Sequence, residues 1–374
     1  MPGPLEGLKA IEMAGLGPCP LAGQLLADMG ADVIVVDRKG AKHDPADINR
    51  RLKRSIALDL KQPDNVAALL KIIETADILI EGFRPGVMER LGLGPQACHE
   101  HNPGLIYGRM TGWGQDGPLA PTAGHDINYL AITGLLSAIG LKDQPPIPPL
   151  NLAADYAGGT MFLLFGVLAG LHERTRSGKG QVIDVAMSDC APLLAGLIQT
   201  MAHHGQWTEA RQSNLLDGGA PFYRCYETAD GKHMSLGALE PQFFAEFARI
   251  AGIDAEDCAS QYDRATWPEK HARYAVLFRT KTRDEWTALF EGSDACVAPV
   301  LTASEAPDHP HNVARQVFAR PGGVLQVNPS PRFSRTPARA PEAATAPGAD
   351  TSRVLEEAGF SVAEIEALAG KAPG

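Results

Sequence analysis

The chain has 374 residues, of which 44% are hydrophobic and 21% are charged, and its formal net charge is −10. This length leaves room for two or three domains, and an acidic chain is a poor general binder of nucleic acid. The six cysteines are scattered and include no CxxC pair, which favours a reducing compartment over a disulfide scaffold. We therefore expect a cytoplasmic protein without a nucleic-acid partner.

A signal peptide and a membrane anchor are not expected either. The first residues lack a charged segment followed by a long apolar one. The longest apolar stretch, at 161–171, is too short to span a bilayer.

Apolar runs and helical patterns alternate through the first half of the chain. The runs predicted to be strands lie at 8–13, 32–37, 55–60, 77–80, 105–110 and 181–186. Helices are expected at 21–29, 63–76, 85–91 and, as a long apolar segment, at about 155–174. This alternation predicts a parallel sheet of the α/β class. The apolar run at 33–36 fits a strand that is covered on both faces.

The pattern changes in the second half. Two alternating runs flank Ala229-Asp230-Gly231 and predict a β-hairpin. Helices at 241–251 and 283–291 complete what we expect to be a separate small α+β domain. The stretch 320–349 is rich in Pro, Ala and Arg, which is typical of a linker or surface crossing, and 352–368 has a helical pattern.

The turn after the first predicted strand is rich in glycine and proline. It contains Gly15, Gly17 and Pro20, and the second strand ends in Asp37-Arg38, a spacing similar to a dinucleotide fingerprint. However, Pro20 stands where a third glycine is usual, and it has no N–H to offer a phosphate. A plain turn is therefore favoured, and a nicotinamide cofactor is the weaker alternative.

Positive charge gathers near several strand ends. The densest cluster spans 50–54 (RRLKR) and precedes a predicted strand. A charge run is usually a solvated face, but further cations follow other strand ends, namely Arg38, Lys61, Arg84 and Arg90. Cations gathered near the strand ends of one sheet predict a phosphate-rich nucleotide ligand.

Three residues are candidates for acid–base chemistry. His125 opens a predicted helix, and histidine titrates near neutrality, although a lone histidine is more often structural. Asp155 stands at the expected entry of the long apolar helix, where the helix dipole stabilises negative charge. Glu240 precedes Pro241 at a strand-to-helix turn and is either a helix cap or a carboxylate that orients a histidine.

Two glycines favour a functional role for the region of Asp155. Glycine destabilises a helix, so Gly158 and Gly159 would not be needed in the first turn if Asp155 served only as a helix cap. We expect them to leave the backbone open to close approach.

Several long segments resemble one family. They include PLEGLKAIEMAGLGP, RSIALDLK, ADILIEGFRPGVMERLGLGP, AGHDINYLAITG, PPLNLAADYAGGTMFLLFGVLAGL and LDGGAPFYRCYETADGKHMSLGALEPQFF. On these segments the chain resembles the α-methylacyl-CoA racemases of the class III CoA-transferase superfamily. The resemblance covers nearly the whole chain and is weakest after about residue 330.

The resemblance implies a domain plan and a quaternary structure. It implies a Rossmann-like large domain that begins with 1–186, a linker at 187–222, a small α+β domain at 223–309, a return linker at 310–328, and a segment at 329–374 that completes the large domain. It also implies an interlocked homodimer, with each active site between the large domain of one chain and the small domain of the other.

The resemblance also implies an activity and site residues. The reaction is epimerisation at C2 of 2-methyl-branched acyl-CoA thioesters, with His125 and Asp155 as acid/base pair and Glu240 supplied by the partner subunit. Supporting residues would be Asp126, Asn151, Gly158 and Gly159. Contacts to CoA would come from Arg38, Ala57, Leu60, Lys61, Gly82, Arg84 and Arg90. No metal or separate cofactor is implied, because coenzyme A is part of the substrate.

The residues agree with this chemistry but leave alternatives. Inverting a carbon acid needs one base on each face, and backbone N–H groups near Asp155 and Gly158-Gly159 are candidates to stabilise the enolate oxygen. CoA transfer with Asp155 as nucleophile is the first alternative, and a non-catalytic CoA-ester binding protein is the second. The sequence does not identify the acyl group of the substrate. Met187, Met201 and Met234 either line the surface that binds this acyl group or are ordinary packing residues.

Overall fold

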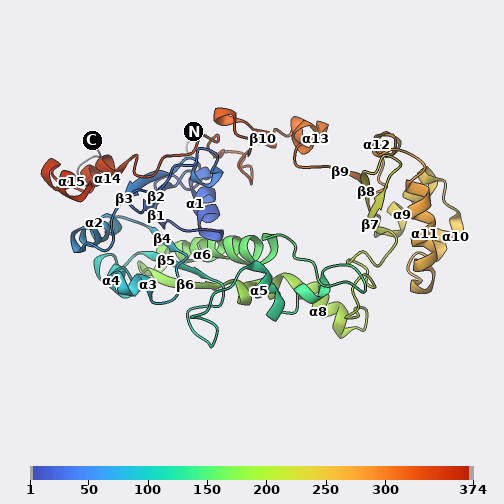
Figure 1. Cartoon of the computed structure of the whole chain (residues 1–374), viewed down its shortest axis with the longest axis horizontal. Helices are drawn as coiled ribbons and strands as arrows, with labels where there is room; N and C mark the ends of the chain where they lie inside the picture. The colour runs from blue at the N-terminus through green and yellow to red at the C-terminus, as the bar shows by residue number, and fades with distance from the viewer. Residues whose placement is uncertain (1–2, 370–374) are drawn as a thin grey trace. The chain divides into compact units, whose positions relative to one another are not determined.

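The structure is a computed structural model that describes residues 3–369 and divides into two compact units. Unit 1 comprises Met1–Thr133, Leu150–Leu194 and Pro310–Gly374. Unit 2 comprises Gly134–Pro149 and Ala195–His309 (Figure 1). The units divide the chain at other points than the expected domains, since 134–149 groups with unit 2 and 187–194 with unit 1.

Unit 1 is built on a six-stranded sheet in the order β3-β2-β1-β4-β5-β6 (Figure 1). Every neighbouring pair is parallel, which confirms the predicted α/β class. The strands are β1 (Lys9–Met13), β2 (Asp32–Asp37), β3 (Arg54–Ala57), β4 (Ile78–Glu81), β5 (Ile106–Thr111) and β6 (Gln181–Ala186). The strand order reverses between β1 and β4, so ligands of such a fold bind at the carboxyl ends of these strands.

Helices cover both faces of this sheet. One face packs against α2 (Pro63–Ile73), α3 (Val87–Arg90), α4 (Pro95–His101) and α14 (Thr351–Glu357), through buried side chains such as Ile11 and Leu79. The other face carries α1 (Pro18–Asp28) and α6 (Met161–Ser177). Gly108 on β5 lets α6 approach closely, because a Cβ there would lie 2.8 Å from Leu163 Cδ1.

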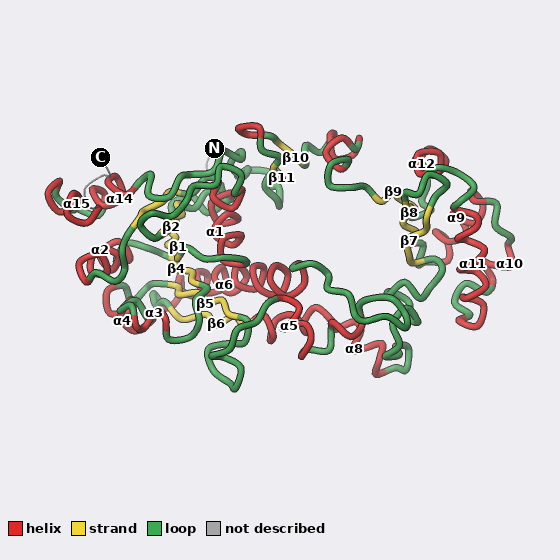
Figure 2. Tube along the Cα trace, in the orientation of Figure 1, coloured by secondary structure: helices red, strands yellow, loops and turns green. Residues whose placement is uncertain are grey.

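The end of the chain returns to the edge strand β3. The backbone N–H groups of Ser55 and Ala57 donate to Asp350 Oδ2 and Thr351 Oγ1, each at 3.0 Å. This covers strand groups that would otherwise be exposed at a sheet edge. The stretch before it is mostly loop, with the short antiparallel pair β10 (Phe318–Ala319) and β11 (Gln326–Val327) (Figure 2).

The helical pattern at 352–368 forms two helices rather than one, α14 and α15 (Val362–Ala369). Gly359, at φ +81°, interrupts it in the left-handed region that favours glycine.

The long apolar helix is longer than predicted and begins differently. A π-helical segment, η3 (Leu152–Thr160), continues directly into α6. Together they form one helix, Leu152–Ser177, which by length and composition alone could cross a membrane. The expectation that no apolar segment is long enough was therefore wrong. Such a helix is weak evidence for a membrane, because a core helix meets the same criterion, and α6 packs on β5 and β6.

Unit 2 is a small α+β unit with an aromatic core. Strands β7 (Tyr223–Glu227), β8 (His233–Gly237) and β9 (Val297–Val300) form an antiparallel sheet, which confirms the predicted hairpin. Helices α9 (Pro241–Ala251), α11 (Trp267–Phe278) and α12 (Arg283–Phe290) pack on this sheet. The rings of Phe247 and Phe278 stack with their centroids 6.2 Å apart. The shorter helices are α7 (Met187–Cys190) and α13 (Pro310–Ala314) in unit 1, and α8 (Gly196–His203) and α10 (Ala255–Ala259) in unit 2.

Candidate active site

His125 stands at the start of helix α5 (Asp126–Ile132) in unit 1. Its backbone is extended, and its N–H donates to Asn128 Oδ1 at 3.1 Å, which closes the first turn of the helix. The His125 residue is exposed. The turn therefore presents the imidazole to solvent at a fixed point of the backbone.

Asp155 lies in the first turn of η3 but not at its cap, because the segment begins at Leu152 after Asn151. Burial raises the pKa of Asp155, and the charge of Asp126 raises it further. A hydrogen bond from the Asn151 side chain and the nearby His125 act in the opposite direction. His125 is thus close enough to Asp155 for its charge to act on that carboxyl.

The carboxylate of Asp126 joins the two helix starts. Asp126 is 4% exposed, and its Oδ2 accepts hydrogen bonds from the N–H groups of Ala154 and Asp155, both at 2.8 Å. These N–H groups belong to the first turn of η3, where the helix itself supplies no acceptor. They are therefore not free to stabilise an enolate oxygen, which is contrary to our expectation.

Gly158 and Gly159 serve packing. Both are buried, so the expectation that they leave the backbone open was wrong. A Cβ on Gly158 would lie 3.2 Å from Ala191 Cα, and one on Gly159 would lie 3.2 Å from Met187 Cγ. The absence of side chains lets η3 lie directly against α7 and the residue that follows it.

A cluster of aromatic residues behind the site was not predicted. The Tyr129 hydroxyl donates to the Gly124 carbonyl at 2.5 Å, and the rings of Trp113 and Tyr129 meet edge to face at 4.8 Å. Burial, with smaller contributions from the charges of Asp155 and Asp126, raises the pKa of Tyr129 to about 12. The available signal was spacing, since Tyr129 stands four residues after His125 and so one helical turn away.

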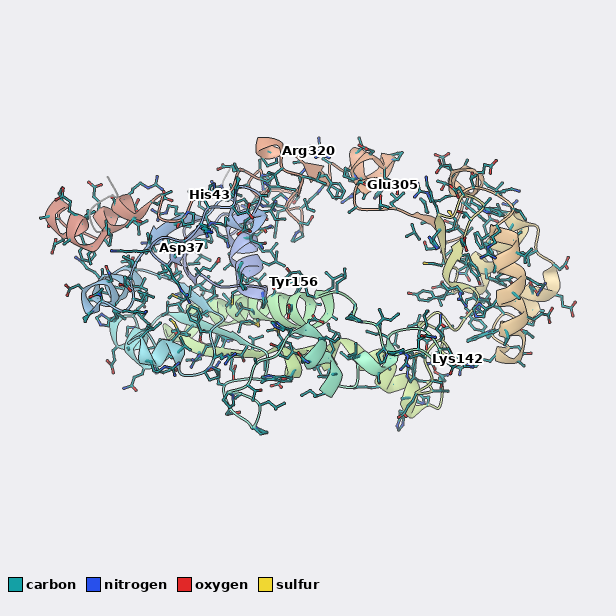
Figure 3. All side chains as sticks on the ribbon, in the orientation of Figure 1. Asp37, His43, Lys142, Tyr156, Glu305 and Arg320 are labelled. Carbon is teal, nitrogen blue, oxygen red and sulfur yellow. The ribbon has the colours of Figure 1, made fainter. Side chains whose placement is uncertain are left out.

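The basic cluster at 50–54 is not a phosphate site, because its cations are paired inside unit 1. Arg51 and Asp28 meet at 2.6 Å, Lys53 and Glu12 at 2.5 Å, and all four side chains are almost completely buried. Arg50 pairs with Asp37 at 2.7 Å (Figure 3 labels Asp37), and Arg54 pairs with Asp32 and Glu357. The cluster therefore holds the unit together.

A second group of cations is exposed. Arg38 follows β2, Lys61 follows β3, and Arg84 and Arg90 follow β4, so all four stand beyond carboxyl ends of the sheet. None of them forms an ion pair within residues 3–369. Arg84 also lowers the pKa of Tyr129, although burial of Tyr129 dominates. This group, unlike the cluster at 50–54, therefore consists of exposed cations that no carboxylate neutralises within residues 3–369.

The other predicted CoA contacts lie in the same region. Gly82 directly follows β4, and a Cβ there would lie 3.1 Å from Cys19 Sγ on α1. Ala57 is the last residue of β3, and a Cβ on Gly348 would lie 2.9 Å from its Cβ. Leu60 is partly buried and packs against the core of the sheet. A side chain at Gly82 would therefore press against Cys19 of α1.

Glu240 lies in unit 2, at the N-cap position of α9. Its side chain is exposed and makes no capping hydrogen bond, so the structure does not support the simple capping role. Met234 belongs to the core of this unit, and Met187 and Met201 are also buried.

Comparison with known proteins identifies the class. The model of CoA-transferase family III matches residues 5–351, so the chain belongs to this family. Its fold agrees, because a CaiB/BaiF family protein from Brucella suis superposes with a TM-score of 0.82 at 25% identity, over 96% of this chain and all of the other.

Two curated relatives carry the name alpha-methylacyl-CoA racemase. The protein of Mus musculus is 47% identical and covers 96% of this chain and 95% of its own. The protein of Homo sapiens is 43% identical, with 97% and 96% covered.

Proposed function

We propose that the chain epimerises 2-methyl-branched acyl-CoA thioesters at C2 by two-base proton transfer. The observation that carries the proposal is the proximity of His125 and Asp155, two acid/base groups at the starts of two helices that are joined through Asp126. The two racemases, at 43–47% identity, support the same reaction.

The reaction needs one proton shared between the two groups. For one stereoisomer, neutral His125 removes the C2 proton, which leaves an enolate, and protonated Asp155 delivers a proton to the opposite face. For the other stereoisomer, ionised Asp155 removes the proton and protonated His125 returns one. The raised pKa of Asp155 suits both duties, because a base and an acid work best when their pKa lies near the working pH.

We infer that the exposed cations Arg38, Lys61, Arg84 and Arg90 bind the phosphates of coenzyme A. Exposed cations without carboxylate partners can form charge-assisted hydrogen bonds to phosphate. Coenzyme A enters as part of the substrate, so the proposal requires no separate cofactor or metal. Cytoplasmic localisation stays a prediction of the sequence.

We also propose that two chains associate. Unit 1 exposes large apolar side chains on η3, α6 and the edge strand β6: Leu152 is 53% exposed, Phe165 72% and Val182 42%. Large apolar side chains that are exposed on neighbouring elements are typical of a surface that a protein partner or a membrane covers, and we propose a second copy of the chain. In the interlocked arrangement, Glu240 would come from the second chain. Light scattering on the wild type and on Phe165→Glu tests this, and a wild-type monomer would contradict it.

The activity is tested by proton exchange. The protein is incubated with (2R)-2-methylacyl-CoA in D2O, and C2 is followed by NMR. We expect deuterium to be incorporated at C2 with inversion of configuration. His125→Ala and Asp155→Ala should each lower the rate about 10²- to 10⁴-fold, because each removes a general acid or base. Absence of exchange with folded wild-type protein would refute the racemase.

CoA transfer is the second candidate, because the family is named for it. In that reaction the Asp155 carboxylate would attack the thioester carbonyl, expel the CoA thiolate and carry the acyl group as a mixed anhydride, which the thiolate would then attack to give an aspartyl-CoA thioester and the free acid. Mass spectrometry of the enzyme with acyl-CoA and a second carboxylic acid distinguishes the two. An adduct on Asp155 with transfer, and no exchange at C2, would favour the transferase.

A further inference from the structure

The carboxylate of Asp126 is shared between the two proposed bases. Asp126 directly follows His125 in the chain, and its Oδ2 accepts the N–H of Asp155 itself at 2.8 Å. The bond from Ala154 N–H, also at 2.8 Å, fixes the same turn of η3 from the neighbouring residue. One buried side chain therefore sets the position of Asp155 relative to His125.

The second oxygen of Asp126 does something that capping does not require. Oδ1 is buried and has no hydrogen-bond partner within the described residues 3–369. One acceptor oxygen suffices for the two N–H groups, and an asparagine side chain would supply it. A buried carboxylate oxygen without a partner costs free energy, so the charge itself has a role beyond capping.

The charge of Asp126 acts on Asp155 with little competition from other groups. The elements packed against η3 are α1, α5, α6 and α7. Among the described residues, the charged groups that act on Asp155 are His125 and Asp126, both at the start of α5. Tyr129 of α5 responds to the charges of Asp155 and Asp126, and its pKa of about 12 keeps it neutral. Tyr156 follows Asp155 on η3 itself. The other titratable groups of these elements act elsewhere or lie far along α6: Asp28 pairs with Arg51, Cys19 faces Glu12 and Glu81, Asp189 acts on Asp184 and Cys190, and His172, Glu173, Arg174 and Arg176 stand at the end of α6.

We propose that Asp126 is a positioning residue whose buried charge both fixes Asp155 opposite His125 and strengthens Asp155 as a base. This inference rests on the proposed function and adds a defined role to a residue that touches no reacting atom. The sign follows from like charges. An anion beside Asp155 raises the pKa of Asp155, and removal of that anion lowers it.

The test is the pH dependence of kcat for Asp126→Asn. This substitution keeps an oxygen for the two N–H groups and the side-chain volume but removes the charge. In the direction where Asp155 removes the C2 proton, the rate falls as Asp155 becomes protonated, so the acid limb reports its pKa. We expect the limb to move to lower pH and kcat to fall about tenfold, because a weaker base is a poorer catalyst. KM should change less than about twofold, because the proposed phosphate contacts are intact.

Two further variants keep the test decisive. Asn151→Ala removes a hydrogen bond that lowers the pKa of Asp155, so its acid limb should move to higher pH, opposite to Asp126→Asn. Asp350→Asn is the matched control: Asp350 Oδ2 also accepts a backbone N–H, from Ser55 at 3.0 Å, but outside the site, so the limb should not move. Circular dichroism checks that each variant is folded.

The outcomes separate the two levels of proposal. A folded wild type that exchanges no C2 proton refutes the proposed function, and the role of Asp126 with it. An active wild type whose limb stays in place in Asp126→Asn refutes only the role of Asp126, even if kcat falls, because a purely structural cap would lower the rate without moving the limb. Should Asp126→Asn fail to fold, an unmoved limb in Asn151→Ala would overturn the inference.

Discussion

Two groups of cations in unit 1 look alike in the sequence and differ in the structure. Arg51 and Lys53 are buried, and each meets a buried carboxylate, whereas Arg38 and Arg90 are exposed and form no ion pair within the described residues. In the first group, Arg51 reaches Asp28 of helix α1 and Lys53 reaches Glu12 of strand β1. The second group stands beyond the carboxyl ends of the strands.

The difference shows which property assigns a cation to folding or to binding. A buried cation must keep its carboxylate, because an unpaired charge in the interior is very costly. It cannot then exchange that partner for a phosphate. An exposed cation without a partner has lost no hydration and can gain a charge-assisted hydrogen bond on binding. Density of charge in the sequence was the wrong criterion, and burial of the pair is the right one.

Among the substitutions in the buried group of cations, we expect Arg51→Ala to lower the stability of the protein most. It would leave Asp28, which is 0% exposed, without its cation, and would remove bonds to Gln326 and Val327 in the returning segment. Loss of one partner of a buried pair costs about 3–5 kcal/mol. Urea unfolding of the full chain should show a loss of this size. An unchanged midpoint would mean that the pair does not hold the unit together.

A second variant tests the same group by crowding it. Gly23 of α1 lies against the Lys53–Glu12 pair, and a Cβ there would stand 1.7 Å from Glu12 Oε2. This oxygen cannot swing away, because Glu12 is buried and bonded to Lys53 at 2.5 Å. We expect Gly23→Ala to destabilise the protein by about 1–3 kcal/mol.

The control for that variant is Gly196→Ala in helix α8. A Cβ on Gly196 meets nothing within 4 Å. Alanine should therefore stabilise this helix by up to about 1 kcal/mol, through its higher helix propensity. If both substitutions shifted the urea midpoint in the same direction, contact with the buried pair would not be the cause.

Much of the fold could be predicted from local pattern. The six parallel strands coincide with the apolar runs to within a few residues, and the hairpin around Asp230 formed as its turn residues indicate. These features depend on neighbours in sequence. The interruption at Gly359 and the π-helical start at Leu152 were missed, because a helical period continues through both and does not distinguish them.

The site was less predictable than the fold. His125 and Asp155 were chosen for their chemistry, and the two lie close enough that the charge of His125 lowers the pKa of Asp155, against the larger effect of burial. The pairing of Lys53 with Glu12, 41 residues earlier, has no local signal. Nor does the burial of Gly158 against Ala191, so packing was mistaken for openness to substrate. Such features depend on tertiary contacts, which a single sequence does not display.

Loss of an exposed cation should affect binding without affecting stability. For Arg38→Ala we expect KM for acyl-CoA to rise about tenfold, equivalent to about 1.4 kcal/mol for one charge-assisted hydrogen bond. The value of kcat and the urea midpoint should stay as in the wild type, because the exposed Arg38 side chain forms no ion pair or hydrogen bond within residues 3–369. Steady-state kinetics at low and high salt measures this, and an unchanged KM would remove Arg38 from the proposed phosphate site.

The smallest effect is expected for Arg54→Ala, which lies between the two groups. Arg54 is paired, with Asp32 and with Glu357 at 2.6 Å, but these carboxylates are 41% and 46% exposed. Water therefore screens the pairs, and their loss should cost less than about 1 kcal/mol. The deficit should shrink further at 1 M salt, where the screening length is only about 3 Å. Unfolding in urea at two salt concentrations measures both values. A loss as large as that of Arg51→Ala would show that pairing alone, rather than burial of the pair, decides which cations hold this unit together.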